Sequence, residues 1–112
     1  MQPFTKQVIQ IIRSIPPGQV MTYGQIAASA GSPRAARQVV RILHSMSTTQ
    51  QLPWHRVVNK HGEIALGDPD SAEEQRLRLE EEGITFTLEQ RIPLEQYRFE
   101  AHLSVEEVSS EE

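Results

Sequence analysis

The stretch TYGQIAASAGSPRAARQVVRILHSM, residues 22–46, contains two short helical patterns separated by a glycine. Thr22 is a favourable N-cap for a first helix over residues 23–30, because its hydroxyl can accept a hydrogen bond from an early backbone N–H. The Gly-Ser-Pro that follows suits a helix stop and a new start, which predicts a second helix over residues 33–45. Two short helices joined by a tight turn with glycine predict a helix-turn-helix.

The second of these helices has one apolar face and one basic face. Apolar side chains recur at helical spacing and predict the packed face, which comprises Ala35, Val39, Ile42 and Met46. The other face has the spacing i, i+3, i+4 and i+7 and comprises Arg34, Arg37, Gln38 and Arg41. No acid interrupts this basic face, so it indicates contact with phosphates more than an ordinary solvated surface, which usually mixes signs.

The remaining patterns predict a mixed α/β fold that is mostly helical, with a small sheet. A first helix is expected over residues 4–14 and ends before Pro16-Pro17-Gly18. Ser71 and Glu74 have capping-box spacing, which predicts a late helix over residues 71–82. Short extended segments are expected at residues 19–21, 57–58, 63–66 and 84–88.

Charge divides the chain into two unlike parts. Residues 1–62 contain seven basic residues and no Asp or Glu, whereas residues 63–112 contain all 15 acids and four arginines. A basic part beside an acidic part predicts one surface for an anionic partner, although the overall net charge is −4. We expect one DNA-binding domain over residues 1–99 and a disordered acidic tail over residues 100–112.

The chain has no cysteine, which excludes disulfides, thiolate metal ligands and a cysteine nucleophile. The four histidines lack zinc-ligand spacing, so we expect neither a metal nor a cofactor. No signal-peptide pattern or long apolar run is present, and we expect a cytoplasmic protein that associates with the nucleoid when bound to DNA.

The string Pro53-Trp54-His55-Arg56-Val57 resembles the Pro-Cys-His-Arg-Val motif of the O6-alkylguanine-DNA alkyltransferases, with tryptophan in place of cysteine. Residues 15–27, 33–39 and 80–84 also resemble that family, and the resemblance covers roughly residues 3–88. It implies the winged helix-turn-helix-like C-terminal domain of the family. The tryptophan variant is similar to the alkyltransferase-like proteins.

Tryptophan at this position changes the expected chemistry. Alkyl transfer from guanine O6 needs a thiolate, and an indole nitrogen is a donor only. We therefore expect no alkyltransferase activity. Trp54 instead predicts an aromatic wall in a base pocket, where stacking contributes about 1–3 kcal/mol and a buried methyl group about 0.8 kcal/mol. For an isolated tryptophan, a place in the core would be the simpler interpretation.

The resemblance implies roles for further residues. Tyr23 would crowd the phosphate beside the target and help to rotate the nucleotide outward, and Arg37 would fill the vacated space in the base stack. Arg34 and Arg41 would contact DNA, and His55 and Arg56 would belong to the lesion-binding site beside Trp54. His55 and Glu82 resemble the proton relay of the enzymes, here without a thiol to serve, and we expect a structural pair braced by Arg56 and Asn59.

Three segments depart from the family pattern. Met46 occupies the position of an expected asparagine hinge. The loop Leu66-Gly67-Asp68-Pro69 replaces the usual Tyr-Ser-Gly in one wall of the alkyl pocket, which leaves the range of alkyl groups open. Residues 93–99 could form either an added wall or a packing arm.

The leading hypothesis is a non-enzymatic, monomeric sensor that flips O6-alkylguanine from duplex DNA and marks it for nucleotide excision repair. The resemblance implies excision-repair proteins as partners, with the acidic residues 63–112 as a candidate docking face. Two alternatives remain. A helix-turn-helix transcription regulator would read DNA sequence and ignore alkylation, and a hydrolase or glycosylase based on His55 would release a product.

Overall fold

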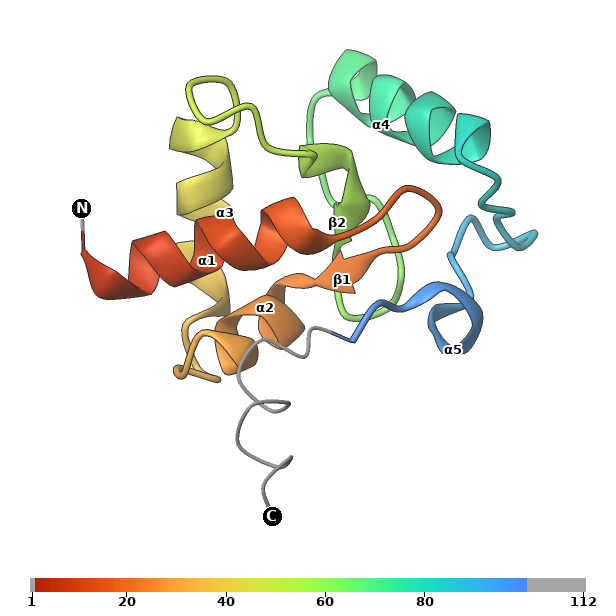
Figure 1. Ribbon diagram of the computed structural model, residues 1–112. Helices are drawn as coiled ribbons and strands as arrows, with labels where there is room; N and C mark the ends of the chain where they lie inside the picture. The colour runs from red at the N-terminus through yellow and green to blue at the C-terminus, as the bar shows by residue number, and fades with distance from the viewer. Residues whose placement is uncertain (1, 101–112) are drawn as a thin grey trace.

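The computed structural model describes residues 2–100. Its elements, in chain order, are α1 (Pro3–Ser14), β1 (Met21–Thr22), α2 (Tyr23–Ser29), α3 (Ala36–Met46), the 3-10 helix η1 (Trp54–Arg56), β2 (Val57–Val58), α4 (Pro69–Glu81) and α5 (Leu94–Tyr97) (Figure 1). The fold is mostly helical with a small sheet, as the sequence predicts. Within the described residues, no helix is both long enough and apolar enough to cross a membrane.

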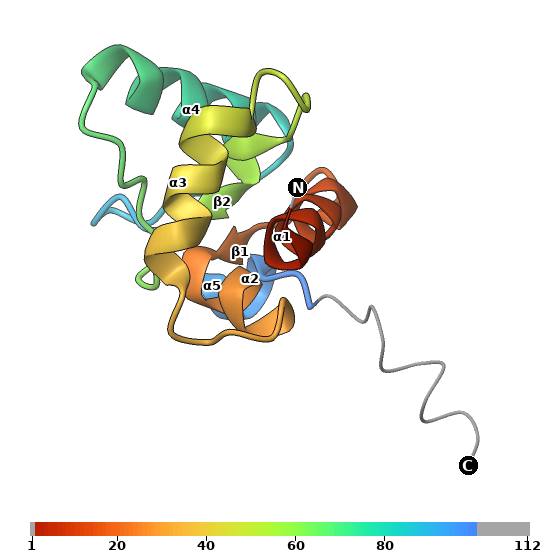
Figure 2. The same cartoon turned by 90° about the vertical axis from the view of Figure 1, so that its left-hand side faces the viewer.

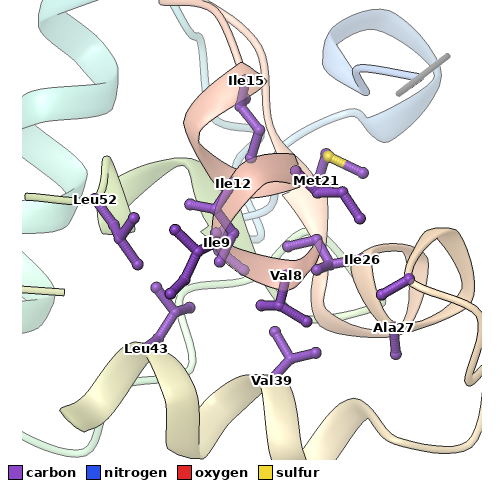
Figure 3. Packing of buried hydrophobic residues seen from close by; sticks show 13 residues of the cluster. Val8, Ile9, Ile12, Ile15, Met21, Ile26, Ala27, Val39, Leu43 and Leu52 are labelled. Carbon is purple, nitrogen blue, oxygen red and sulfur yellow. The ribbon is translucent and has the colours of Figure 1, made fainter. Parts of the chain in front are cut away.

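The main core lies where α1 packs across α2 and α3. Val8, Ile11 and Ile12 of α1 are fully buried, and Figure 3 shows Val8 near Val39 of α3 and Ile26 of α2. The i, i+3, i+4 spacing in α1 puts these side chains on one face. Truncating one such isoleucine to alanine costs about 2–5 kcal/mol, so this face holds the helix-turn-helix together.

A two-stranded parallel sheet joins the two halves of the chain. Met21 pairs with Val57 and Thr22 with Val58, and α2 and α3 lie in the connection between the strands. The four paired residues are buried. This pairing brings the start of α2, at Tyr23, beside the segment that contains Trp54.

The helix-turn-helix forms as predicted, with one correction. The side chain and backbone of Thr22 exchange hydrogen bonds with those of Gln25, which makes a capping box, and Gly31 adopts the left-handed φ of +94° that ends α2. However, α3 begins at Ala36 and not at residue 33. The N–H of Ala35 bonds to the carbonyl of Ser32, so Ser32–Ala35 forms a turn before the helix.

Figure 2 shows α3 along one side of the molecule, with α2 beside its N-terminal end and α4 toward its C-terminal end. The start of α4 also differs from expectation. Asp68, and not Ser71, is the N-cap, and its carboxylate accepts hydrogen bonds from the N–H and hydroxyl of Ser71 at 3.0 and 2.7 Å. The predicted helix therefore starts two residues earlier, at Pro69.

Residues 63–66 and 84–88, predicted as extended segments, form no strand. The loop after β2 is instead held by Asn59, whose side-chain oxygen accepts from the N–H groups of His61 and Glu63 at 2.9 Å. Leu88 is 96% exposed in a turn, so the alternation around it reflects no sheet face.

Residues 93–99 form a packing arm. They contain α5, and the N–H of Phe99 bonds to the carbonyl of Val20 at 2.8 Å. Val20, Val58 and Leu79 form a second, smaller buried cluster, against which the side chains of Leu94 and Tyr97 pack. The predicted disorder of the acidic tail falls almost wholly on residues 101–112, which lie outside the described part of the chain.

Glu82, the C-cap of α4, joins three parts of the fold. Its carboxylate accepts hydrogen bonds from the Arg56 guanidinium at 2.8–3.2 Å and from the backbone N–H of Gly18 at 3.0 Å, and it pairs with Nε2 of His55 at 2.7 Å. Arg56 also donates to the carbonyl of Ile15. This Glu82 junction ties the end of α4 to η1 and to the turn between α1 and β1.

The charge of Glu82 is favoured by these donors. Burial alone would raise the pKa of Glu82, but the hydrogen bonds from Arg56, His55 and Gly18 outweigh it and lower the pKa to about 2. Because the folded-state pKa lies below the usual value of 4.5, the stabilisation is complete above that value and is lost as pH falls toward 2.

We predict that Glu82→Gln lowers the free energy of unfolding by about 1–3 kcal/mol at pH 7, since it leaves partly buried donors on Arg56 without an ionised acceptor. Urea unfolding of both proteins should show this difference shrinking between pH 4.5 and pH 2.5. Glu81→Gln is the matched control, because Glu81 is exposed and forms no salt bridge within residues 2–100. A difference independent of pH would contradict the assignment.

Candidate nucleic-acid interface

A cavity of about 390 Å³ lies between α3, η1 and the loop that leads into α4. This volume falls within the range of pockets that hold a small ligand. The lining is mostly apolar and neutral-polar and contains no lysine or arginine. It comprises Tyr23, Val40, Leu43, His44, Ser47, Thr48, Trp54, Val57, Leu66, Gly67, Asp68, Ser71 and Gln75.

Trp54 lies between this cavity and the main core. It is half-buried, packs against the core cluster and also lines the cavity. The geometry therefore combines both interpretations that the sequence allowed, a core tryptophan and a pocket wall.

Gln75 of α4 holds η1 in place. It is 2% exposed, and its side-chain N–H₂ donates to the carbonyls of His55 and Val57 at 3.0 Å each. The two carbonyls belong to residues directly after Trp54, on either side of Arg56. The bonds therefore hold the backbone turn that positions the indole. Nothing in the sequence indicated this role, because Gln75 stands among charged residues in a helix that looks solvent-exposed.

Arg78 adds a second contact from α4, against Trp54 itself. Its guanidinium carbon lies 5.6 Å from the centroid of the indole ring, within cation–π range. The carboxylate of Glu74 holds the guanidinium through bonds of 2.6 and 3.0 Å. Arg78 is one turn of helix beyond Gln75, so one face of α4 supports both the backbone and the ring of Trp54.

Tyr23 contributes to another part of the cavity lining. It is the first residue of α2, directly after the strand that pairs with β2, and it packs partly against the core. Burial raises the pKa of its phenol, which keeps the hydroxyl protonated and able to donate a hydrogen bond.

The arginines lie outside the cavity but lead toward it. Arg37 and Arg41 are exposed on α3, at i and i+4 of a stripe that continues at i+7 to His44 in the cavity lining. Arg34 is exposed in the turn before α3 and not on the helix. Within residues 2–100, none of these three arginines pairs with a carboxylate.

The predicted pair of His55 and Glu82 is formed, with Arg56 as a third member, in the Glu82 junction beside the cavity. His55 is buried and does not line the cavity. Its Nδ1 has no hydrogen-bond partner among the described residues, so no hydroxyl there is bonded to it as a nucleophile would be. Arg56 braces the turn after α1, and Asn59 braces the loop after β2.

Of the three segments that depart from the family pattern, one lines the cavity and two pack elsewhere. Leu66, Gly67 and Asp68 line the cavity, as expected for this loop. Met46 and Phe99 pack against the main core, Leu94 and Tyr97 pack against the second cluster, and none of them lines the cavity. No group of three histidine, aspartate or glutamate side chains within residues 2–100 is arranged to bind a metal ion.

We predict that Arg78→Ala changes the fluorescence of Trp54, because loss of the cation frees the indole and alters its electrostatic surroundings. Trp54 is the single tryptophan of the chain, so emission and iodide quenching report on it alone. Arg76→Ala is the matched control, since Arg76 lies on the same helix against the ring of Phe86. Identical spectra for wild type and Arg78→Ala would refute the contact.

Comparison with known proteins identifies the family of this chain. Residues 3–84 match the model of the family "6-O-methylguanine DNA methyltransferase, DNA binding domain". A protein of Escherichia coli (strain K12) named "DNA base-flipping protein" is 48% identical over 96 residues, which cover 86% of this chain and 74% of the relative. "Alkyltransferase-like protein 1" of Schizosaccharomyces pombe is 41% identical over 85 residues, covering 75% of this chain and 79% of that protein.

A solved structure has a similar fold. It is that of S. pombe Atl1 in complex with damaged DNA containing O6-carboxymethylguanine, with a TM-score of 0.76 and 35% sequence identity over 90% of this chain and 98% of that one. The resemblance inferred from the motif around Trp54 and the predicted fold class are thus both confirmed. The chain belongs to the family of the 6-O-methylguanine DNA methyltransferase DNA-binding domain.

Proposed function

We propose that this protein is a non-enzymatic sensor of O6-alkylguanine, which it rotates out of duplex DNA into the cavity beside Trp54. One observation carries the proposal: the arginine stripe of α3 leads to a base-sized cavity with an indole in its wall, in a chain without cysteine. The name of the E. coli relative and the damaged DNA bound to S. pombe Atl1 support it.

The free energies favour an alkylated guanine over a normal one. A mispairing alkylguanine is cheaper to extract than a well-paired guanine, which is one source of selectivity. Inside the cavity, contact of Trp54 with the base contributes about 1–3 kcal/mol, and burial of a methyl group about 0.8 kcal/mol more. Without a thiolate, the base keeps its alkyl group and the complex persists.

DNA contacts are assigned as follows in this proposal. Arg34 and Arg41 attract phosphates, Tyr23 turns the nucleotide toward the cavity, and Arg37 enters the base stack in its place. The protein acts as a monomer in the cytoplasm, at the nucleoid. Excision-repair proteins then recognise the marked site, with the exposed acidic residues of α4 as their docking face.

The central test titrates the protein into two duplexes that differ only in guanine or O6-methylguanine, at one stated salt concentration. We expect O6-methylguanine to bind about tenfold more tightly or better, a difference of about 1.4 kcal/mol or more. Analysis of the recovered DNA should find the lesion intact. Equal affinities, with selectivity for base sequence, would favour a transcription regulator, and a consumed lesion would favour an enzyme based on His55.

The role of Arg37 has its own test. Arg37→Ala should weaken binding to the lesion duplex by about tenfold, because the vacated stack is no longer filled. Arg37→Lys keeps the charge but not the planar guanidinium, and we expect it to restore little of the loss. Arg41→Ala is the comparison, since loss of a phosphate contact weakens both duplexes alike. Full rescue by lysine would make Arg37 a phosphate contact.

A further inference from the structure

Gln75 of α4 is almost completely buried, and it also lines the cavity beside Trp54. Its amide nitrogen Nε2 donates one hydrogen bond to the carbonyl of His55 and one to the carbonyl of Val57. A carbonyl can only accept, so these two partners determine which end of the amide is nitrogen, and both N–H bonds of the side chain are used. The polar atom that remains is the carbonyl oxygen Oε1.

This oxygen is an acceptor that no donor of the protein occupies. Within residues 2–100, no N–H or O–H group bonds to Oε1 of Gln75. It is not sealed inside the protein either, because Nδ1 of His55 is the one fully buried side-chain polar atom without a partner in that part of the chain. The small exposed part of Gln75 therefore includes Oε1, and the cavity is the space that Gln75 lines.

A fixed acceptor can distinguish bases by the donors that they carry. Guanine has a 2-amino group with two N–H donors, which alkylation at O6 leaves in place, whereas adenine has no amino group at that position. If a base without this group covers the acceptor, the acceptor is left unpaired and binding is weakened. Hydroxyls elsewhere in the lining, on Tyr23, Ser47 and Thr48, can turn to donate or to accept, so they require no donor from the base.

We propose that Gln75 is a specificity-determining residue whose Oε1 accepts a hydrogen bond from the 2-amino group of the flipped base. Trp54 then contacts the alkyl group, and Gln75 selects purines that carry a 2-amino group. The two bonds of Nε2 hold the amide in place, so the acceptor is ordered before the base arrives. This inference rests on the proposed function and adds base selection to it.

The test is a cycle of two proteins and two bases. Matched duplexes carry O6-methylguanine or O6-methylhypoxanthine, which differ only in the 2-amino group, and Kd is measured for each at one salt concentration. The variant is Gln75→Lys, because an ammonium group can still donate to the carbonyls of His55 and Val57 but cannot accept. Removing the amino group also changes pairing in the duplex, but both proteins meet the same duplexes, so this effect cancels between them.

We expect the ratio of Kd for O6-methylhypoxanthine to Kd for O6-methylguanine to be about three- to tenfold larger in wild type than in Gln75→Lys. Gln75→Met, of similar length and with no strong acceptor, provides a second variant and should lower the ratio as well. Gln10→Lys is the matched control, because Gln10 is exposed on α1 and does not line this cavity. It adds the same charge and should leave the wild-type ratio unchanged.

The outcomes separate this inference from the proposed function. If Gln75 only supports η1, its variants bind both lesion duplexes more weakly by the same factor, and an unchanged ratio overturns the inference alone. A ratio that falls equally in Gln10→Lys is an effect of charge and also overturns it. Equal binding of guanine and O6-methylguanine duplexes by wild type overturns the proposed function and this inference with it.

Discussion

The carboxylate of Glu82 is the point at which three separate parts of the chain meet. Arg56 of η1, His55 beside it and the backbone of Gly18 all donate to or pair with this one group. Removing the acceptor from a partly buried group of donors of this kind costs about 1–3 kcal/mol. Since η1 carries Trp54, the orientation of the indole depends on α4 being held by Glu82 at its end and by Gln75 in its middle.

The same junction explains how a residue pair typical of catalysis becomes structural. In a histidine–glutamate relay the histidine needs a nucleophile to deprotonate, and this chain has no cysteine to provide one. Nε2 of His55 is engaged by Glu82, and Nδ1 has no partner within the described residues. What remains is a support for the cavity, which agrees with the proposed role of holding a base unchanged.

The charged residues are also distributed unequally between the two parts of the chain. The N-terminal part presents an arginine stripe on α3 that pairs with no carboxylate within residues 2–100, whereas the acids lie from residue 63 onward. Asp68 stands where these two parts meet, in the wall of the cavity. The lining of the cavity therefore takes residues from the basic part of the chain, on α3, and from the acidic part, at Asp68.

Local sequence by itself determined the helix-turn-helix, the absence of thiol chemistry and the motif around Trp54. Capping at Thr22, the glycine at position 31 and helical periodicity are properties of neighbouring residues, so they can be read without the fold. Boundaries were less accurate: α3 begins three residues later than predicted and α4 two residues earlier, because a turn at Ser32 and a cap at Asp68 compete with equally plausible signals. Alternation at residues 84–88 predicted a strand that has no partner.

Only the tertiary structure decided what surrounds Trp54. Gln75, Arg78 and Asp68 are 14–24 residues away in sequence, and nothing in their local pattern distinguishes them from a solvated helix. They lie near Trp54 because the parallel pairing of Met21 with Val57 and the Glu82 junction bring α3, η1 and α4 around one cavity. The sequence therefore identified Trp54, but long-range packing determined which residues line the cavity with it and which charged side chains lie near it.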